Sequence, residues 1–253
     1  MISVSIVSHG HGELVNQLLR DLESCPAVSV ILLTLNLAEE QIDCPDSLAG
    51  KVTFIRNPQP KGFGANHNQA FAQVTTPFFC VLNPDIRMPQ DPFPALLAAM
   101  ESDQHELIAP AILDSAGNLD DSARYLPTPW GILRKVLGGK DGRYSFELGG
   151  ENFSPDWVGG MFMLLRSQVF RSVGGFDERF FLYYEDVDLC CRIRLARHSL
   201  ALCPATSVVH EARRASHRNP QFLKWHLASM IRFFCSTIFW RLWARSFFRT
   251  QGR

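Results

Sequence analysis

The chain of 253 residues is long enough for one full-sized domain, and its composition of 46% apolar and 20% charged residues excludes a disordered chain, a collagen and a coiled coil. Its 25 basic and 25 acidic residues are unevenly distributed, because residues 212–253 hold nine bases and no acid. The acidic body argues against a nucleic-acid binder, and the basic end predicts contact with an anionic partner.

Strands and helices alternate through the first half of the chain. Hydrophobic patterns predict strands at 3–7, 28–33, 52–55, 78–82 and 107–109, and helices at 13–22, 65–73 and 94–101. Continuous apolar strands between helices indicate an α/β fold with a mostly parallel central sheet covered by helices. Functional sites in such sheets form at the carboxyl ends of the strands.

The second half is less regular. Residues 114–156 are rich in Gly, Asp, Ser and Pro, which predicts a mobile loop beside the site. Further elements are expected at 157–164 (strand), 168–173 (helix), 185–197 (helix), 200–203 (strand) and 220–249 (long helix). The predicted organisation is therefore one domain over 1–219 and a basic, aromatic helical tail over 220–253.

Targeting signals are not evident in the sequence. The opening residues alternate like a strand and carry no basic segment, and the apolar stretch 228–243 is interrupted by Arg232 and Arg241. The seven cysteines form no CxxC pair and are interpreted as buried, reduced thiols. These features predict a cytoplasmic protein.

The tripeptide Asn83-Pro84-Asp85 follows a predicted buried strand. A carboxylate at such a position can hold a divalent metal that bridges a diphosphate, although the tripeptide alone favours a turn. His210, in a predicted loop, could complete a metal shell only if the fold brings it near Asp85.

Two other segments could carry chemistry. Residues 62–68 place two glycines before a predicted helix start, which suits a phosphate ligand or simply a tight loop with a helix cap. Glu185, Asp186 and Asp188 follow an aromatic run, where one could act as a general base or all could cap the helix.

The tail interleaves basic residues with Trp and Phe. Over 222–240 this pattern fits either an amphipathic helix on an anionic membrane or a helix that packs on the core or dimerises. Beyond Trp240 it favours the membrane surface.

These pieces in this order resemble a known family, the inverting GT-A glycosyltransferases of family 2, in their rhamnosyltransferase-like branch. The resemblance covers about residues 2–230 and is carried by Ile6-Val7-Ser8-His9-Gly10-His11, Gly62-Phe63-Gly64-Ala65-Asn66-His67-Asn68, Leu82-Asn83-Pro84-Asp85, Trp157-Val158-Gly159-Gly160-Met161-Phe162-Met163, Gly174-Gly175-Phe176-Asp177-Glu178-Arg179-Phe180-Phe181, Tyr184-Glu185-Asp186-Val187-Asp188-Leu189 and His210. The nearest likeness is to enzymes that add L-rhamnose from dTDP-rhamnose to polyprenyl-diphosphate-linked GlcNAc in bacterial O-antigen (lipopolysaccharide) assembly.

The resemblance implies a role for each matching residue. Asp85 and His210 would bind Mg²⁺ or Mn²⁺, and Asp186 would be the general base, with Glu185 as the alternative. The donor-binding residues would be Ser8, His9, Asn36, Gly62, Gly64, Asn66, Asn68, Asn83, Asp85 and Gly160. The acceptor side would hold Trp157, Gly159 and Asp188. The implied acceptor is a lipid-linked saccharide, reached by a peripheral protein on the inner face of the plasma membrane.

One position departs from the family. Its second strand usually ends in an Asp-Asn pair whose Asp helps bind the pyrimidine ring, whereas here Leu35 precedes Asn36. The donor could therefore be a UDP- or GDP-sugar, or the protein could be a non-catalytic partner with a degenerate donor site. A nucleotidyltransferase is the third alternative, but it would be expected to carry a basic loop after the first strand, where His9-Gly10-His11-Gly12 holds no Lys or Arg.

Overall fold

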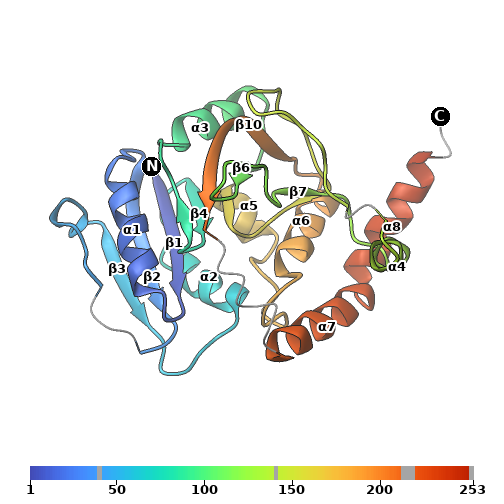
Figure 1. The fold of residues 1–253 in the computed structure, drawn as a ribbon, viewed down its shortest axis with the longest axis horizontal. Coiled ribbons are helices and arrows are strands. Elements are labelled where there is room, and N and C mark those ends of the chain that lie inside the picture. Colours follow the sequence, from blue (N-terminus) through green and yellow to red (C-terminus); the bar gives the residue numbers. More distant parts are fainter. Residues whose placement is uncertain (39–41, 140–141, 212–219, 251–253) are drawn as a thin grey trace.

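The computed structural model describes residues 1–38, 42–139, 142–211 and 220–250 (Figure 1). Residues 212–219 and 251–253, which belong to the basic end, lie outside the described residues. The strands are β1 (Ile2–Ser8), β2 (Val28–Leu35), β3 (Val52–Arg56), β4 (Phe78–Leu82), β5 (Ile86–Arg87), β6 (Leu107–Leu113), β7 (Ala123–Arg124), β8 (Trp157–Val158), β9 (Phe162–Arg166) and β10 (Leu200–His210). The helices are α1 (Gly12–Glu23), α2 (Phe63–Phe71), α3 (Phe93–Ser102), α4 (Pro129–Val136), α5 (Ser167–Ser172), α6 (Glu185–Leu195), α7 (Pro220–Phe234) and α8 (Thr237–Thr250), with a 3-10 turn at Asp46–Leu48.

The described residues form an eight-stranded sheet in the order β3-β2-β1-β4-β9-β6-β10-β5, and β7 pairs with β8 in a separate ribbon. Of the seven strand pairs described in the large sheet, four are parallel. The three antiparallel pairs join β9 to β4 and β6, and β5 to β10. The mostly parallel sheet expected from the sequence is confirmed.

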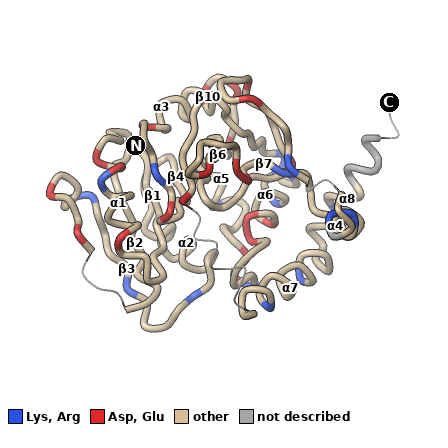
Figure 2. Tube along the Cα trace, in the orientation of Figure 1, with Lys and Arg blue, Asp and Glu red and all other residues tan. Residues whose placement is uncertain are grey.

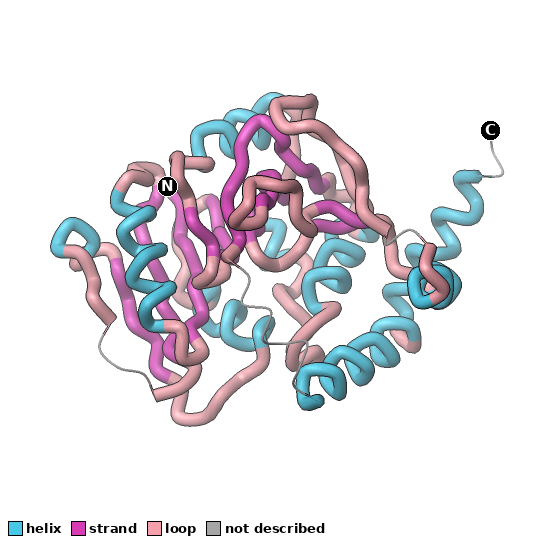
Figure 3. The backbone as a smooth tube through the Cα atoms, viewed as in Figure 1, coloured by secondary structure: helices cyan, strands magenta, loops and turns pink. Residues whose placement is uncertain are grey.

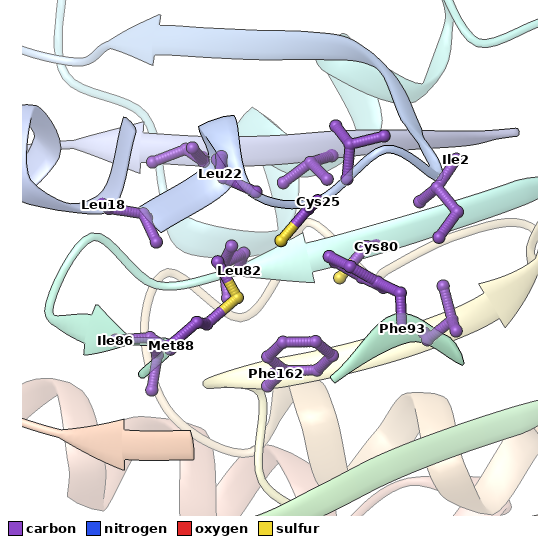
Figure 4. Packing of buried hydrophobic residues seen from close by; sticks show 14 of the residues in the cluster. Ile2, Leu18, Leu22, Cys25, Cys80, Leu82, Ile86, Met88, Phe93 and Phe162 are labelled. Carbon is purple, nitrogen blue, oxygen red and sulfur yellow. The ribbon is translucent and has the colours of Figure 1, made fainter. Parts of the chain in front are cut away.

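Helices cover both faces of the sheet. On one face the apolar stripe of α1 and part of α3 pack against the strands, and Figure 4 shows Leu18, Phe93 and Phe162 within this cluster. On the other face α2, α5 and α6 pack against the alternate strand residues. A strand buried on both faces needs apolar residues in succession, as the sequence of β4 provides.

The first half of the chain matches its prediction closely, since every predicted strand and helix up to α3 ends within two residues of the observed one. All seven cysteines lie in the described part of the chain and are free, and five of them are buried. Burial raises the pKa of Cys25 to about 12, as expected for an unreactive thiol.

Three predicted strands differ from the observed ones. The strand expected at 157–164 is two strands in different sheets, because glycines 159 and 160 separate β8 from β9. The strand expected at 200–203 runs to His210, with an irregularity where Pro204 cannot donate a ladder hydrogen bond. The strand expected at 107–109 extends to Leu113, because β10 pairs with it along that length.

The long helix expected over 220–249 is two helices. Ser236 separates them: its N–H donates to Phe233 O, closing α7, and its Oγ accepts from Phe239 N at 3.2 Å, opening α8. Phe233 and Phe239 are buried against Phe180 and Val187 of the main domain, so these helices are packed onto it.

Residues 114–156 are not a featureless loop, although Figure 3 shows long loop segments there. They contain β7 and the helix α4. Pro129 occupies the first turn of α4, and Thr128 caps it by accepting a hydrogen bond from Gly131 N.

Candidate active site

Asp85 and His210 are brought together by the pairing of β5 with β10. Ile86 lies opposite His210 in the antiparallel ladder, and Glu211 N donates to the backbone oxygen of Asp85 at 2.8 Å. His210 Nε2 lies 3.3 Å from Asp85 Oδ2, and His210 Nδ1 lies 3.5 Å from Asp120 Oδ2. His210 therefore lies near Asp85, which is the condition that a metal-binding role for His210 requires.

The electrostatics of this corner favour a charged pair. Burial by itself would raise the pKa of Asp85. The hydrogen bond and the charge of His210 lower this pKa by more, so it lies below its usual value. Burial lowers the pKa of His210, but Asp85 and Asp120 outweigh it, and the net pKa is raised. The Oδ1 atom of Asp85 is buried without a hydrogen-bond partner.

A carboxylate oxygen left without a donor beside an imidazole nitrogen suits a divalent cation, which takes both ligand types. Asp85 and His210 therefore fit a metal site. Among the described residues no group of three or more His, Cys, Asp and Glu side chains is placed to hold an ion. Two protein ligands leave coordination positions for a bound diphosphate, as Mg²⁺ sites often do.

Asp186 lies in the first turn of α6. Its Oδ2 accepts from Gly160 N at 3.0 Å and its Oδ1 from Val187 N at 2.8 Å. Burial raises the pKa of Asp186, and these two backbone donors oppose the shift. A carboxylate with a raised pKa that is held by backbone N–H groups is suited to general-base catalysis.

The neighbouring acids have different surroundings. Glu185 is buried with its Oε2 unpartnered, and burial together with the charge of Asp186 raises its pKa well above the usual value. Asp188 is buried and ion-paired with Arg192 at 2.7 Å, and Arg192 also donates to the backbone oxygens of Val173 and Gly175. Asp188 is thereby connected, through Arg192, to the 173–175 turn.

The two residues before α6 adopt a costly backbone conformation. Tyr183 and Tyr184 have φ angles of 70° and 68°, the left-handed region that non-glycine residues rarely occupy. Helix α7 holds this turn: Ser229 Oγ donates to Leu182 O at 2.8 Å, and His226 packs edge-on against both tyrosine rings. The turn that precedes Asp186 is therefore held in place by α7.

A network of three asparagines lies at the ends of β2 and β3 and in α2. Asn57 Nδ2 donates to the Oδ1 atoms of Asn36 and Asn66, at 2.8 and 2.6 Å. Asn36 and Asn66 also bond to the backbone of Lys61, and Asn36 Nδ2 lies 3.2 Å from His9 Nδ1. This network ties the glycine-rich loop to the strand ends.

Two glycines of that loop are required by close packing. A Cβ at Gly62 would lie 2.6 Å from Phe181 O, and one at Gly64 would lie 2.6 Å from Phe176 Cβ. Asn68 fixes the same region by exchanging hydrogen bonds with the backbone N–H and oxygen of Phe176. An open pocket of about 540 Å³ lies beside the loop and is lined partly by Lys61, Gly62 and Asn68.

The β7–β8 ribbon lies next to Asp186. Gly159 N donates to Ser122 O at 3.2 Å, and Gly160 N donates to Asp186. Trp157 Nε1 donates to Tyr125 O at 3.0 Å, and the Arg124 guanidinium lies 5.8 Å from the Trp157 ring centroid. Trp157 and Gly159 thus lie on the same side of the sheet edge as Asp186.

Backbone hydrogen bonds connect the surroundings of the Asp85–His210 pair to Asp186. Asn83 N donates to Met161 O at 2.9 Å, and the adjacent Gly160 donates to Asp186. Because β4 and β9 are antiparallel, the end of one and the start of the other meet at the same edge as the ends of β1 and β10. Ser8, Asn36, Asn83, Asp85, Gly160, Asp186 and His210 all lie along this edge.

Leu35 does not face this edge as a ligand-binding side chain. It is buried in the hydrophobic cluster that includes β1 and α1. In the described part of this segment, up to residue 38, β2 is followed directly by Asn36 and by no acidic residue.

Sequence reasoning missed three residues here. Asn57 could have been found, because it directly follows β3 at the same edge of the sheet. Asp120 and Arg124 carried no pattern, because they lie in the irregular segment whose path the sequence does not determine.

Three comparisons with known proteins bear on the site. The model of the family described as glycosyl transferase family 2 matches residues 34–167. Rhamnosyltransferase WbbL of Escherichia coli (strain K12) is 32% identical over 92% of this chain and 92% of its own length. N-acetylglucosaminyl-diphospho-decaprenol L-rhamnosyltransferase of Mycobacterium tuberculosis is 31% identical over 63% of this chain and 58% of its own.

Solved structures share the fold at low sequence identity. Residues 1–349 of S. aureus TarS in complex with UDP-GlcNAc match with a TM-score of 0.65 and 12% identity, over 99% of this chain and 74% of that one. Mannosyltransferase PcManGT from Pyrobaculum calidifontis, in complex with GDP-Man and Mn²⁺, matches with a TM-score of 0.59 and 14% identity, over 91% and 64%. The fold is that of GT-A glycosyltransferases.

Proposed function

The chain belongs to glycosyl transferase family 2 and is a glycosyltransferase, and we propose that it transfers L-rhamnose from dTDP-rhamnose to a saccharide linked to a lipid diphosphate. Two relatives named as rhamnosyltransferases support the sugar, and the name of one supports an acceptor of GlcNAc on a lipid diphosphate. The observation that carries the proposal is the joining of Asp186 to the Asp85–His210 pair along one sheet edge.

In the proposed reaction Asp186 accepts the proton of the acceptor hydroxyl. The acceptor oxygen forms a bond to the anomeric carbon while the bond from that carbon to the diphosphate oxygen breaks, so the configuration inverts. Mg²⁺ or Mn²⁺ bound by Asp85 and His210 would stabilise the negative charge on the leaving nucleoside diphosphate. Gly160 supports this geometry because it carries no side chain between Asp186 and the ring of Phe63.

The donor side is proposed to lie over the asparagine network and the glycine-rich loop. Asn36 and Asn66 would act by fixing the backbone of that loop, since their amides are bonded to Lys61 and Gly62. Asn68 would act by fixing Phe176, against which Gly64 packs. His9, Ser8 and Asn83 would lie nearest the nucleotide, at the ends of β1 and β4. Leu35 offers no carboxylate to the nucleobase of the donor, so UDP- and GDP-sugars are the alternative donors.

We further propose that the protein works on the inner face of the plasma membrane. No helix in the described residues is both long and apolar enough to cross a bilayer. Helices α4, α7 and α8 contain no acidic residue and hold several bases. Figure 2 shows no red segment in α4, in α7 or in the part of α8 that it colours. These helices also expose Trp130, Leu133, Leu223, Ile231 and Trp240, a combination that suits an anionic bilayer surface.

Thermal unfolding in the presence of dTDP, UDP, GDP and CMP, each with and without Mn²⁺, tests the donor site. A ligand at 100 times its Kd should stabilise the protein by about 2.7 kcal/mol. We expect dTDP with Mn²⁺ to give the largest shift, and Asp85→Ala to abolish it.

Transfer of rhamnose from dTDP-rhamnose to a GlcNAc-diphospholipid then tests the reaction. A larger shift with UDP or GDP would replace the donor while keeping the enzyme class. Absence of any nucleotide effect and of transfer would favour a donor-degenerate partner protein, the alternative that the burial of Leu35 supports.

A further inference from the structure

Two arginines meet where a long loop leaves and rejoins the domain. Arg124 and Arg143 lie opposite each other in an antiparallel bridge, and Tyr125 N donates to Gly142 O at 2.9 Å. The rings of Tyr125 and Tyr144 stack at 3.8 Å beside them. The loop between these residues carries α4.

The two guanidinium groups share one carboxylate. Arg124 is ion-paired with Asp121, and Arg143 Nε lies 3.8 Å from the same Asp121 oxygen. The pair therefore holds two guanidinium groups beside one carboxylate oxygen. The Arg124 side chain is 18% exposed and lies over the Trp157 ring, which holds its planar donors in a fixed direction.

This arginine pair is close to the general base. Its carboxylate partner Asp121 raises the pKa of Asp186, and Arg124 opposes the raised pKa of Tyr184. The ribbon that carries Arg124 bonds to Gly159, next to the residue that holds Asp186. An acceptor hydroxyl at Asp186 would therefore place the rest of the acceptor near these arginines.

The loop also leads from the arginines to an apolar surface. Trp130 and Leu133 of α4 and Leu137 directly after it are exposed, and Lys135 lowers the pKa of His226, which places α4 near α7. A ligand with a sugar at one end, a diphosphate in the middle and a lipid at the other matches this order of base, arginines and apolar helix.

We propose that Arg124 and Arg143 bind the diphosphate of the lipid-linked acceptor. This assignment rests on the proposed function, which supplies the acceptor class. The two guanidinium groups donate hydrogen bonds to phosphate oxygens, while Asp121 keeps Arg124 oriented toward them when the acceptor is absent.

Farnesyl diphosphate, with farnesol as its uncharged counterpart, tests the proposal by direct binding. Excess nucleoside diphosphate and Mn²⁺ are present to occupy the donor site. We expect Arg124→Gln and Arg143→Gln each to weaken farnesyl diphosphate binding about tenfold or more, the effect of losing a charged hydrogen bond, and to leave farnesol binding unchanged.

Arg143→Gln preserves the Arg124–Asp121 pair and guards against a folding artefact in Arg124→Gln. Arg20→Gln is the matched control, since Arg20 is an exposed arginine in an ion pair on α1. In transfer assays the two test variants should raise the acceptor KM and leave the donor KM unchanged, and Arg124→Lys should recover part of the loss.

Unchanged affinity of both test variants for farnesyl diphosphate would overturn the assignment, as would an equal loss of farnesol or nucleotide binding. Because the binding measurement needs no sugar transfer, arginine-dependent diphosphate binding without rhamnose transfer would refute the proposed donor or acceptor sugar alone.

Discussion

The proposed donor side, which is the asparagine network with the glycine-rich loop, and the proposed base side, which surrounds Asp186, are built differently. The donor side is held by neutral amides between residues 36 and 68, all close in sequence and placed by regular strand ends. The base side joins Asp121, Gly160, Asp186 and Ser229, which come from four distant segments, none of them a strand. The donor side is thus a local property of the N-terminal half, whereas the base side depends on the whole chain.

The largest expected effect is on the base side. Asp186→Asn removes the proton acceptor while keeping its shape and should lower kcat by about 10²–10⁴-fold, with nucleotide binding unchanged. Glu185→Gln is the matched control: the buried Glu185 carboxyl, whose pKa is raised, readily holds a proton, so an amide should change kcat little. Steady-state kinetics decide between them, and a larger loss in Glu185→Gln would transfer the role of base to Glu185.

The next effect concerns the attachment of the C-terminal helices. Phe239→Ala empties a buried site against Phe180 and Phe233 and should lower the free energy of unfolding by about 3–5 kcal/mol. Its neighbour Trp240 is 53% exposed, so Trp240→Ala should cost less than about 0.5 kcal/mol and should instead weaken binding to anionic vesicles.

Urea unfolding and vesicle sedimentation of the two variants separate core packing from membrane contact. Deleting residues 236–253 cannot make this distinction, because it removes both side chains. Equal vesicle binding by Trp240→Ala and the unchanged protein would contradict a membrane role for this face of α8.

A third variant tests the donor side. Asn57→Ala removes the donor shared by Asn36 and Asn66 and should cost about 1–3 kcal/mol of stability, because both acceptors are buried. Nucleotide binding should weaken, since the glycine-rich loop loses its anchor, while the pKa seen in the pH profile of kcat should stay constant. A shift of that pKa would show that the two sides are coupled.

The smallest expected effect is the pH dependence of the Asp85–His210 pair in metal-free protein. The raised pKa of His210 contributes stability below its ordinary pKa of about 6.5, and this is lost as the pH rises through the folded value. The lowered pKa of Asp85 contributes stability above about 3.9, lost as the pH falls through its folded value.

Urea unfolding in EDTA should therefore show stability falling from pH 6 to pH 9, and His210→Gln should remove this part of the slope. Metal binding should strengthen over the same range, because a proton on the imidazole competes with the ion. A slope that is the same in His210→Gln would show that other groups cause it.

The donor side and the base side also differ in how well the sequence predicts them. Hydrophobic runs of period two and helical spacing placed β1 to β4 and α1 to α3 almost to the residue, because local pattern determines buried strands and amphipathic helices. The Asp85–His210 contact needed the fold to be known, since 125 positions separate the two residues.

Helix α4 and the Arg124–Arg143 bridge were not predicted at all. Their segment lacks hydrophobic periodicity, and its path is set by tertiary contacts such as the stacking of Tyr125 on Tyr144. The burial of Phe239 was equally hidden, because the next residue in α8, the aromatic Trp240, is exposed.

The left-handed turn at Tyr183 and Tyr184 has a consequence for how the enzyme is made. The turn orients the start of α6, and it is held by α7, which follows α6 in the sequence and is therefore synthesised after it. Chains fold from the N-terminus during synthesis, so the donor side can form while α7 is still being added. A nascent chain that does not yet contain α7 would bind nucleotide without the helix that holds the turn before Asp186, so the ability to activate an acceptor would arise later in synthesis than the donor side.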